Sequence, residues 1–226
     1  AVQDLQQVAV FGPRGVLDDH AFLCRAALDL FECSADADVR FLDAALALDA
    51  VVADHFEDDE HGGFFFTADD AEQLLVREKP DRDGAEPSGT SLHVENLVRL
   101  SMLTDDKAFR VRAERALRAS GQVLQKHPHA LSEMVNALLL LEGGKEIVVV
   151  TPRTKQQDDP LLELVRRRYL PAGVVVVVEE GSSLAGRLPL LRDRGCKDGK
   201  TTVYVCERGS CRLPVTEARA LLAELG

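Results

Sequence analysis

The chain is poor in aromatic side chains. Its 226 residues include no tryptophan and two tyrosines, and aromatic residues make up 5% of the sequence. Ligand pockets are commonly lined by apolar and aromatic side chains around a few polar groups. A glycan site that stacks sugar rings on Trp or Tyr is therefore disfavoured.

An excess of basic charge is also missing. The chain has 27 Lys and Arg against 38 Asp and Glu, a formal net charge of −11. Its densest charged run, 57–60, is acidic, and its one basic cluster, 166–168, suits the C-terminal turn of a helix. Nothing supplies the phosphate-neutralising face that nucleic acids require, so we expect no nucleic-acid binding.

Membrane and secretion signals are absent from the sequence as well. No run approaches the roughly 18 apolar residues of a membrane span, and the first 15 residues lack the pattern of a signal peptide. The odd count of five cysteines favours a reducing compartment over a disulfide framework. We therefore expect no membrane contact and a cytoplasmic location. Because the chain starts at Ala1 and not at Met, we expect an excised fragment or a processed product.

The first region, 1–144, has a helical period. Apolar residues recur every three or four positions, which predicts helices at 16–34, 39–56, 88–103, 106–127 and 128–144. Between the second and third helices, Gly62 and Gly63 precede three Phe residues, which predicts a turn and a short strand. The short linkers between the later helices predict antiparallel hairpins.

The second region, 145–226, changes to continuous β-branched runs. They predict three strands at 146–152, 173–181 and 201–209, buried on both faces as in a parallel sheet. A helix capped by Asp159, with Pro160 at its first position, lies between the first two. The segment 151–159 has no glycine, so a nucleotide-binding phosphate loop is disfavoured. The predicted fold class is α+β, with helical hairpins followed by a small three-stranded α/β segment.

Four segments together carry a family resemblance. They are GVLDDHAFL (15–23), EHGGFFFT (60–67), DGAEPSGTS with NLVRL (83–100) and YVCERGSCRLPVT (204–216). In order and spacing they resemble the C-terminal part of the thioredoxin-domain proteins related to spermatogenesis-associated protein 20, which have bacterial members of YyaL type.

This resemblance implies a larger parent protein. Members of the family carry an N-terminal thioredoxin-like domain and an (α/α) toroid similar to six-hairpin glycosidases and N-acylglucosamine 2-epimerase. No thioredoxin-like domain is present in this chain, and about five helices form only part of a toroid. The expected partners are the remainder of the full-length chain or a complementary fragment, with self-association as a further possibility.

The resemblance directs attention to polar residues at helix ends, which line the pocket in such toroids. Asp18 and Asp19 are candidate catalytic acid–base residues, with His20 beside them as a substrate-binding candidate. The alternative is that the two carboxylates cap a helix. His61 is a second substrate-binding candidate, although turn chemistry alone explains its Gly-Gly motif.

The loop 83–91 supplies the remaining substrate-binding candidates. Asp83, Ser88 and Asn96 are polar and lie in or just after a tight loop that leads into a helix, a place where binding residues are often found. The alternative is a loop held together by its own Asx and Ser turns, with Asn96 bonded to the backbone.

Cys206 and Cys211 are separated by four residues, and several kinds of chemistry fit this spacing. Zinc needs further ligands that only Cys196 could supply nearby, and the spacing is wrong for a C-x-x-C redox motif. A structural or redox-sensitive disulfide fits the turn between them, but a reducing compartment favours two separate thiols. No metal and no cofactor is expected.

Two functional hypotheses follow. In the first, the chain is part of a toroid that binds or processes a sugar-like metabolite. In the second, it is a non-enzymatic scaffold that presents clients to the thioredoxin-like domain of the full-length protein.

Overall fold

The computed structural model describes residues 15–34, 36–72, 75–153, 159–207 and 209–225. Most of the N-terminal segment that lacks a signal-peptide pattern lies outside these residues. So does the stretch 154–158 of the glycine-free loop.

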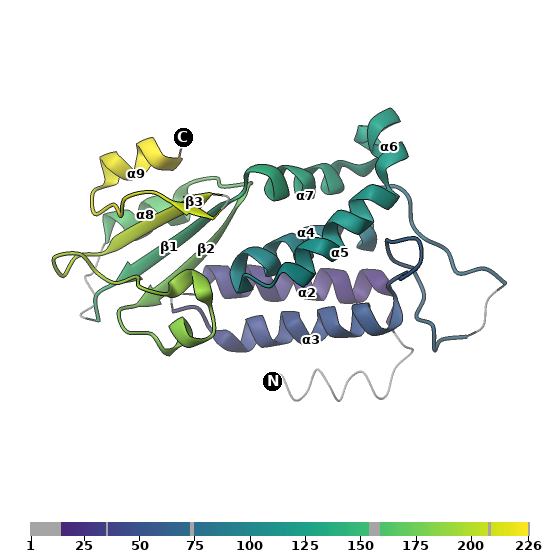
Figure 1. The fold of residues 1–226 in the computed structure, drawn as a ribbon, viewed down its shortest axis with the longest axis horizontal. Coiled ribbons are helices and arrows are strands. Elements are labelled where there is room, and N and C mark those ends of the chain that lie inside the picture. The colour runs from purple at the N-terminus through teal and green to yellow at the C-terminus, as the bar shows by residue number, and fades with distance from the viewer. Residues whose placement is uncertain (1–14, 35, 73–74, 154–158, 208, 226) are drawn as a thin grey trace.

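The first part of the chain is helical (Figure 1). It contains α2 (Leu17–Cys33), α3 (Val39–His55), α4 (Gly89–Thr104), α5 (Lys107–Ala119), α6 (Gly121–Lys126), the 3-10 turn η1 (Pro128–Leu131) and α7 (Ser132–Gly143). The single helix expected at 106–127 is divided at Ser120 into α5 and α6. Ser120 and Gly121 have low helix propensity, which accounts for the break.

The second part adds a sheet with short helices. It contains β1 (Lys145–Thr151), α8 (Pro160–Arg167), β2 (Gly173–Glu179), the 3-10 turns η2 (Ser183–Gly186) and η3 (Pro189–Leu191), β3 (Thr202–Glu207), β4 (Ser210–Cys211) and α9 (Ala218–Leu225). The predicted cap is present, because Asp159 accepts hydrogen bonds from the first turn of α8. The predicted α+β class is confirmed.

Three helices form a layer in which all run in the same direction. α4 lies between α2 and α7, with α3 packed on α2 and α5 on α4 (Figure 1). The N-termini of α2, α4 and α7 therefore lie at one end of the molecule, and their C-termini point toward the sheet. Nearly all of α4 is buried, including its polar residues.

The sheet has the strand order β2-β1-β3-β4. β1 and β2 are parallel, whereas β3 is antiparallel to β1 and β4 to β3. The expectation of three strands in a parallel-type layer is thus corrected to a mixed sheet of four. A continuous apolar run reports burial on both faces and not strand direction, and β4 is too short to show a hydrophobic period.

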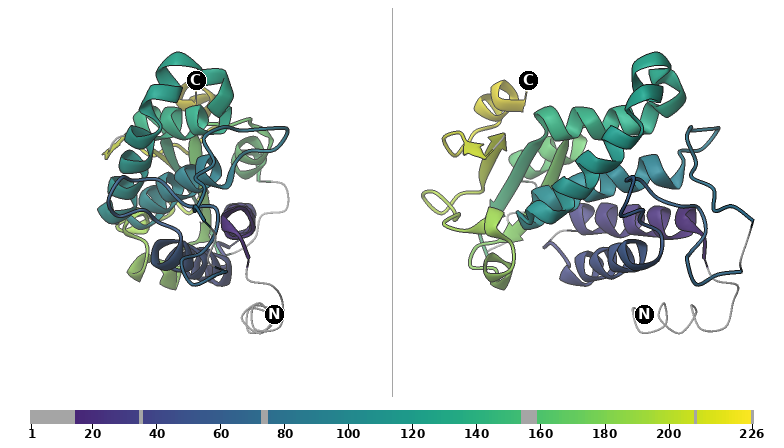
Figure 2. Two further views of the ribbon diagram at one scale, coloured as in Figure 1. Left: turned by 90° about the vertical axis from the view of Figure 1, so that its right-hand side faces the viewer. Right: turned by 45° about the vertical axis from the view of Figure 1, so that its right-hand side comes forward.

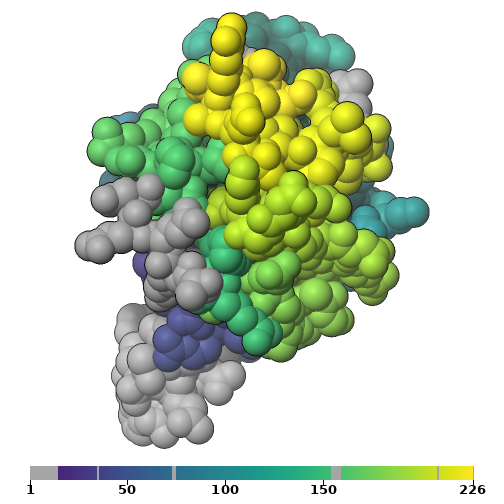
Figure 3. All heavy atoms as spheres, turned by 90° about the vertical axis from the view of Figure 1, so that its left-hand side faces the viewer, coloured from purple at the N-terminus to yellow at the C-terminus, as the bar shows by residue number. Residues whose placement is uncertain are grey.

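Side chains of β1 alternate between two hydrophobic clusters. Val148 and Val150 pack with α2, α3 and α4, whereas Ile147 and Val149 pack with α8 and α9. The sheet is therefore covered on both faces (Figure 2). α9 and the segment before it form much of the surface at this end of the molecule (Figure 3).

The division into 1–144 and 145–226 stays a prediction. α7 ends at Gly143 and β1 starts at Lys145, as the change of period indicates. One hydrophobic cluster nevertheless includes residues from both sides of this point. Among the described helices, none combines the length and the apolar character needed to cross a bilayer.

Candidate functional site

The N-termini of the three parallel helices are joined by hydrogen bonds. We call this the N-terminal junction and define it as Asp18, Asp83, Ser88, Gly89 and Glu133. Asp18 Oδ1 accepts from Gly89 N at 2.9 Å. Asp83 Oδ1 accepts from both Ser88 N and Ser88 Oγ at 3.0 Å, and its Oδ2 accepts from Glu133 N at 2.9 Å. Two carboxylates thus satisfy backbone N–H groups at the starts of α4 and α7.

Three other predicted residues lie on or beside α2. Asp19 Oδ2 accepts from Val16 N at 2.9 Å, and His20 Nδ1 lies 3.0 Å from Val16 O. Asn96 is fully buried, and its Nδ2 donates to Ala21 O at 2.9 Å. The contacts of Asp19 and His20 are those found at a helix N-terminus, and the contact of Asn96 is a hydrogen bond to the backbone.

His61 lies in a separate turn, away from the junction. Its side chain is 72% exposed, with Nδ1 3.5 Å from Asp58 Oδ2. Asp58 Oδ1 holds the turn by accepting from Glu60 N and His61 N. Gly62 and Gly63 have φ values of 78° and 77°, so the turn uses the positive φ that glycine allows.

The structure therefore brings Asp18, Asp83 and Ser88 together, with Asp19 and His20 nearby, and leaves His61 apart. The hydrogen bonds that these residues form are enough to explain why polar side chains occupy these positions. Their catalytic and substrate-binding roles stay predictions.

Next to the N-terminal junction, charged side chains of α2, α4 and α7 form a network. Arg25 Nη1 on α2 lies 2.9 Å from Glu95 Oε2 on α4 and 3.1 Å from Glu133 Oε1 on α7. One guanidinium group thus bridges carboxylates from two other helices. The Glu95 and Glu133 side chains are only 10% and 16% exposed, whereas Arg25 is 31% exposed.

The network continues along α2 and α4 toward the sheet. Arg99 binds Glu32 through Nε and Nη2, and its Nη2 also lies 2.7 Å from Asp29 Oδ1. Glu32 Oε2 accepts from Val175 N of β2 at 3.0 Å. We call Arg25, Asp29, Glu32, Glu95, Arg99 and Glu133 the layer network. It holds two cationic and four acidic groups, so one proton shared between carboxyl groups relieves its excess of negative charge.

Glu95 and Glu133 share that proton. Burial first, and then the hydrogen bond with Glu133, raises the pKa of Glu95 to about 7. The same hydrogen bond lowers the pKa of Glu133. Near neutral pH, Glu95 can therefore donate a proton while Glu133 stays ionised, which is the pairing that general acid–base chemistry uses.

Sequence reasoning did not single out this network. Arg25 with Asp29 and Glu95 with Arg99 are each four positions apart, a spacing that also describes solvent-exposed pairs on a helix. The only signal was that all four lie in predicted apolar helices. No feature of the sequence pattern marked Glu133 as a candidate.

A second buried network joins α3, α4 and α5. Arg112 Nη1 binds both carboxylate oxygens of Asp49 at 3.0 and 2.8 Å, and its Nε lies 2.6 Å from Glu57 Oε2. His93 Nε2, on a fully buried ring, lies 3.2 Å from Asp49 Oδ1. Burial lowers the pKa of His93, although hydrogen bonding to Asp49 opposes this. Arg112 is thus the permanent counter-charge of the cluster.

A cleft of about 500 Å³ lies at the opposite end of the helix layer. It is formed where α4 and α7 end and α5 and β1 begin, and its lining includes Met102, Asp105, Lys107, Glu146 and Gly209. None of the predicted site residues lines it. It borders the hairpin that carries the cysteine pair.

Cys206 and Cys211 are joined by a disulfide. They lie directly opposite each other on β3 and β4. The structure thus has the bonded form and not the separate thiols that the reducing-compartment argument favours. Cys24, Cys33 and Cys196 are free.

One group of potential metal ligands occurs among the described residues. Ligand atoms of His55, Asp69 and Asp70 lie within 4.8 Å of one another. His55 Nδ1 is already hydrogen bonded to Asp69 Oδ1 at 2.8 Å, a contact that raises the pKa of His55. This hydrogen bond accounts for the close approach of His55 and Asp69.

The shared proton predicts a pH dependence of stability. The unfolded chain releases the Glu95 proton near pH 4.5, the ordinary pKa of a glutamate side chain, and the folded chain releases it near 7. Between these values the folded state holds more protons, so the free energy of unfolding falls as pH rises. We expect Glu95→Gln, whose amide donates without ionising, to gain on the order of 2 kcal/mol relative to the wild type between about pH 5 and about pH 8.

Urea unfolding of both chains across this range measures the difference. Glu86→Gln is the control, because Glu86 is exposed on the nearby loop and should keep the pH profile of the wild type. Parallel profiles for Glu95→Gln and the wild type would contradict the shared proton.

No protein-family model matches the chain. The chain is homologous to a part of spermatogenesis-associated protein 20. It is 34% identical over 207 residues to the proteins of that name from Rattus norvegicus and Homo sapiens, which is 90% of this chain and 26% of each relative.

A third relative is an uncharacterized protein of Caenorhabditis elegans. It is 29% identical over 210 residues, which is 92% of this chain and 28% of the relative. The chain thus spans about a quarter of the length of the curated relatives it matches.

Proposed function

We propose that the chain forms part of an (α/α) toroid in a longer protein and that its layer network faces a pocket for a sugar-like metabolite. The layer network carries this proposal. It gathers six charged side chains from three helices that run in parallel, as the inner helices of a toroid do. Carboxylates and guanidinium groups bind hydroxyl-rich ligands through hydrogen bonds.

The proton pair adds acid–base chemistry to this pocket. Glu95 supplies an acid and Glu133 a base within one hydrogen bond of each other, and Arg25 holds both. Arg25 and Asp29 are the most exposed members, with side chains 31% and 52% exposed. A ligand would therefore reach the network from the α2 side.

A thermal-shift panel of sugars and polyols tests the proposal on the 226-residue chain. A sugar that binds should raise Tm by roughly 5 to 10 °C at about a hundred-fold excess over Kd. Arg25→Met should lose this shift, measured against its own unliganded Tm. Arg187→Met is the matched control, because Arg187 pairs with Asp43 at an exposed site between other elements.

Asp19→Asn and Asp83→Asn test the residues predicted from the sequence in the same panel. A shift that survives in both variants but not in Arg25→Met would place the ligand on the layer network. No shift with any sugar would sink the sugar hypothesis.

A second candidate function rests on an apolar stripe along α2. Phe22, Leu23, Ala26 and Leu30 recur at helical spacing on its outer side, and three of them are 38%, 49% and 51% exposed. We call these four residues the α2 stripe. Contiguous exposed apolar residues mark interaction surfaces. This favours a non-enzymatic scaffold that docks on other parts of a longer protein and presents clients to its thioredoxin-like domain.

The stripe predicts self-association of the 226-residue chain. We expect light scattering to show concentration-dependent oligomers that bind an apolar dye. Leu23→Glu combined with Leu30→Glu should give a monomer, because like charges on the stripe resist burial. Leu222→Glu on α9, where Leu222 is 42% exposed, should leave the oligomers unchanged. A monodisperse wild type that binds no dye would contradict this role.

A further inference from the structure

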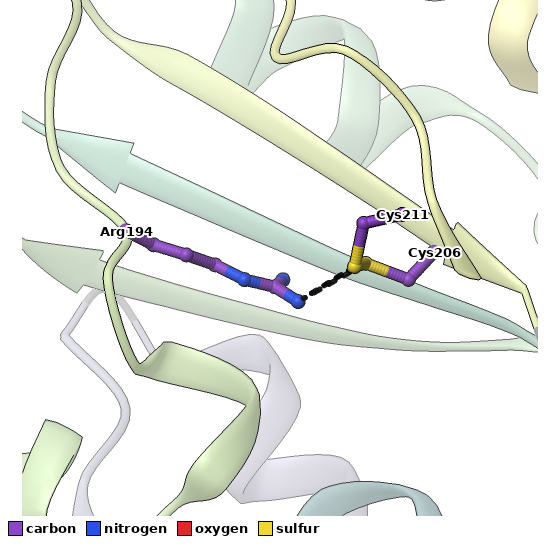
Figure 4. Close-up of a disulfide and its surroundings, with 3 residues drawn as sticks. All are labelled: Arg194, Cys206 and Cys211. Atoms are coloured by element: carbon purple, nitrogen blue, oxygen red, sulfur yellow. Dashed lines mark hydrogen bonds between the residues drawn. A yellow bond between two sulfur atoms is a disulfide. The ribbon is translucent and has the colours of Figure 1, made fainter. Parts of the chain in front are cut away.

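The disulfide has an unusual neighbour, an arginine side chain that reaches both sulfur atoms. Arg194 Nη2 lies 3.0 Å from Cys206 Sγ and 3.3 Å from Cys211 Sγ (Figure 4). Sulfur in a disulfide is a weak acceptor and carries no charge. The guanidinium group therefore gains little from the oxidised form.

Arg194 is held in this position and is not fully satisfied there. Tyr204 hydroxyl donates to Gly195 O at 2.7 Å and accepts from Gly195 N at 3.2 Å, which ties the loop to β3. The Arg194 guanidinium carbon lies 5.4 Å from the centre of the Tyr204 ring. Its Nη1 is buried without a hydrogen-bond partner among the residues that the structure describes. A half-buried cation with an unused donor is suited to a nearby anion.

We propose that Cys206 and Cys211 form a redox-active disulfide that exchanges with external dithiols, and that Arg194 stabilises the Cys206 thiolate released by the exchange. The two cysteines differ in access, since Cys211 is exposed and Cys206 is fully buried. An incoming thiolate can therefore attack Cys211 Sγ. This role is separate from the sugar pocket, which lies in the helix layer.

The exchange consists of two successive nucleophilic substitutions at sulfur. A thiolate of the dithiol bonds to Cys211 Sγ, the Cys206–Cys211 bond breaks, and its electron pair leaves on Cys206 Sγ beside Arg194. The second thiol of the same molecule, as its thiolate, then attacks its own sulfur in the mixed disulfide and releases Cys211. The protein gains two electrons and the dithiol becomes a disulfide. Of the two protons that the dithiol loses, one ends on Cys211 and the other is released to solvent while Cys206 stays a thiolate beside Arg194.

Other charged groups near the sulfurs shape this equilibrium. Glu146 on β1 lies opposite Cys206 in the sheet and interacts with Arg194. Burial raises the pKa of Glu146, and the nearby Arg194 opposes this. The charge of Asp105, which lines the cleft, also raises the pKa of Glu146. Tyr204 lies beside Arg194. Arg194 is the cation in direct contact with the sulfur atoms.

The test equilibrates the 226-residue chain with mixtures of reduced and oxidised dithiothreitol and counts free thiols by alkylation and mass spectrometry. Arg194→Met should shift the equilibrium toward the disulfide by about ten-fold and slow its reduction to a similar degree, because a charged hydrogen bond to the thiolate is lost. Arg194→Lys should recover most of the effect. Arg192→Met, at an exposed position of the same loop, should behave as the wild type.

A variant that keeps Arg194 covers the case in which Arg194→Met does not fold. In Cys211→Ser, the ultraviolet absorbance of the Cys206 thiolate at neutral pH should exceed that of the same chain in denaturant. Equal absorbance would overturn the proposal. So would an Arg194→Met equilibrium within about two-fold of the wild type, or alkylation of both cysteines in the fully oxidised chain.

Discussion

Replacing Arg112 with methionine should lower the free energy of unfolding by about 3 to 5 kcal/mol. Arg112 is the common partner of Asp49 and Glu57, whose side chains are 6% and 7% exposed. Without it, two buried carboxylates lose their guanidinium partner, and the His93 ring beside Asp49 carries no permanent charge to replace it. Chemical unfolding monitored by circular dichroism measures the loss.

The deficit should shrink as pH falls, because the carboxylates can then take up protons and His93 can become charged. Arg110→Met on the same helix is the control. Arg110 forms an exposed pair with Glu114, four positions later, and such pairs contribute about 0.5 kcal/mol or less. If Arg112→Met and Arg110→Met unfold within about 1 kcal/mol of each other, the Asp49 cluster is not the buried ion pair described above.

Features encoded by neighbouring residues were predictable. Apolar period located α2, α3 and α4, the pair Asp159 and Pro160 located the start of α8, and Gly62 with Gly63 located a turn. Each depends on residues within a few positions of one another, so the sequence contains all the necessary information.

Features that depend on distant pairing were not predictable. The direction of β3 relative to β1 and the presence of β4 follow from how the chain returns after η3, where no crossover helix imposes a parallel strand.

The split of α5 from α6 is a local feature, but the amphipathic pattern continues across it and did not reveal it. Ser120 and Gly121 show the break only when read for propensity.

The candidate site shows the same division. Asp18 and Gly89 are 71 positions apart, and Arg25 and Glu133 are 108 apart. The sequence indicated that Asp18 and Asp83 lie near helix ends, but not that these ends belong to one junction. A charge pair at i and i+4 looks the same whether it is exposed or buried. Burial, which raises the pKa of Glu95, becomes visible only in the folded layer.

Gly89→Ala tests the junction itself, and we expect it to cost about 2 to 4 kcal/mol. A Cβ atom at position 89 would lie 2.4 Å from Asp18 Oδ1, 2.9 Å from Leu17 Cγ and 3.0 Å from Asp18 N. Alanine would otherwise favour a helix by about 1 kcal/mol. The clash outweighs this gain because these contacts involve the first turn of α2, which cannot move without disturbing the helix layer. Thermal and urea unfolding measure the change.

The control is Gly121→Ala, at the first position of α6, where nothing lies within 4 Å of an added Cβ. It should be neutral or slightly stabilising. Adding Asp18→Ala to Gly89→Ala removes the closest contact, so the double variant should be more stable than the sum of the single losses by about 1 kcal/mol or more. Additive losses would mean that Asp18 and Gly89 do not meet. In that case α2 and α4 would not share an N-terminal end, and the layer network that lies along them would lose its geometric basis.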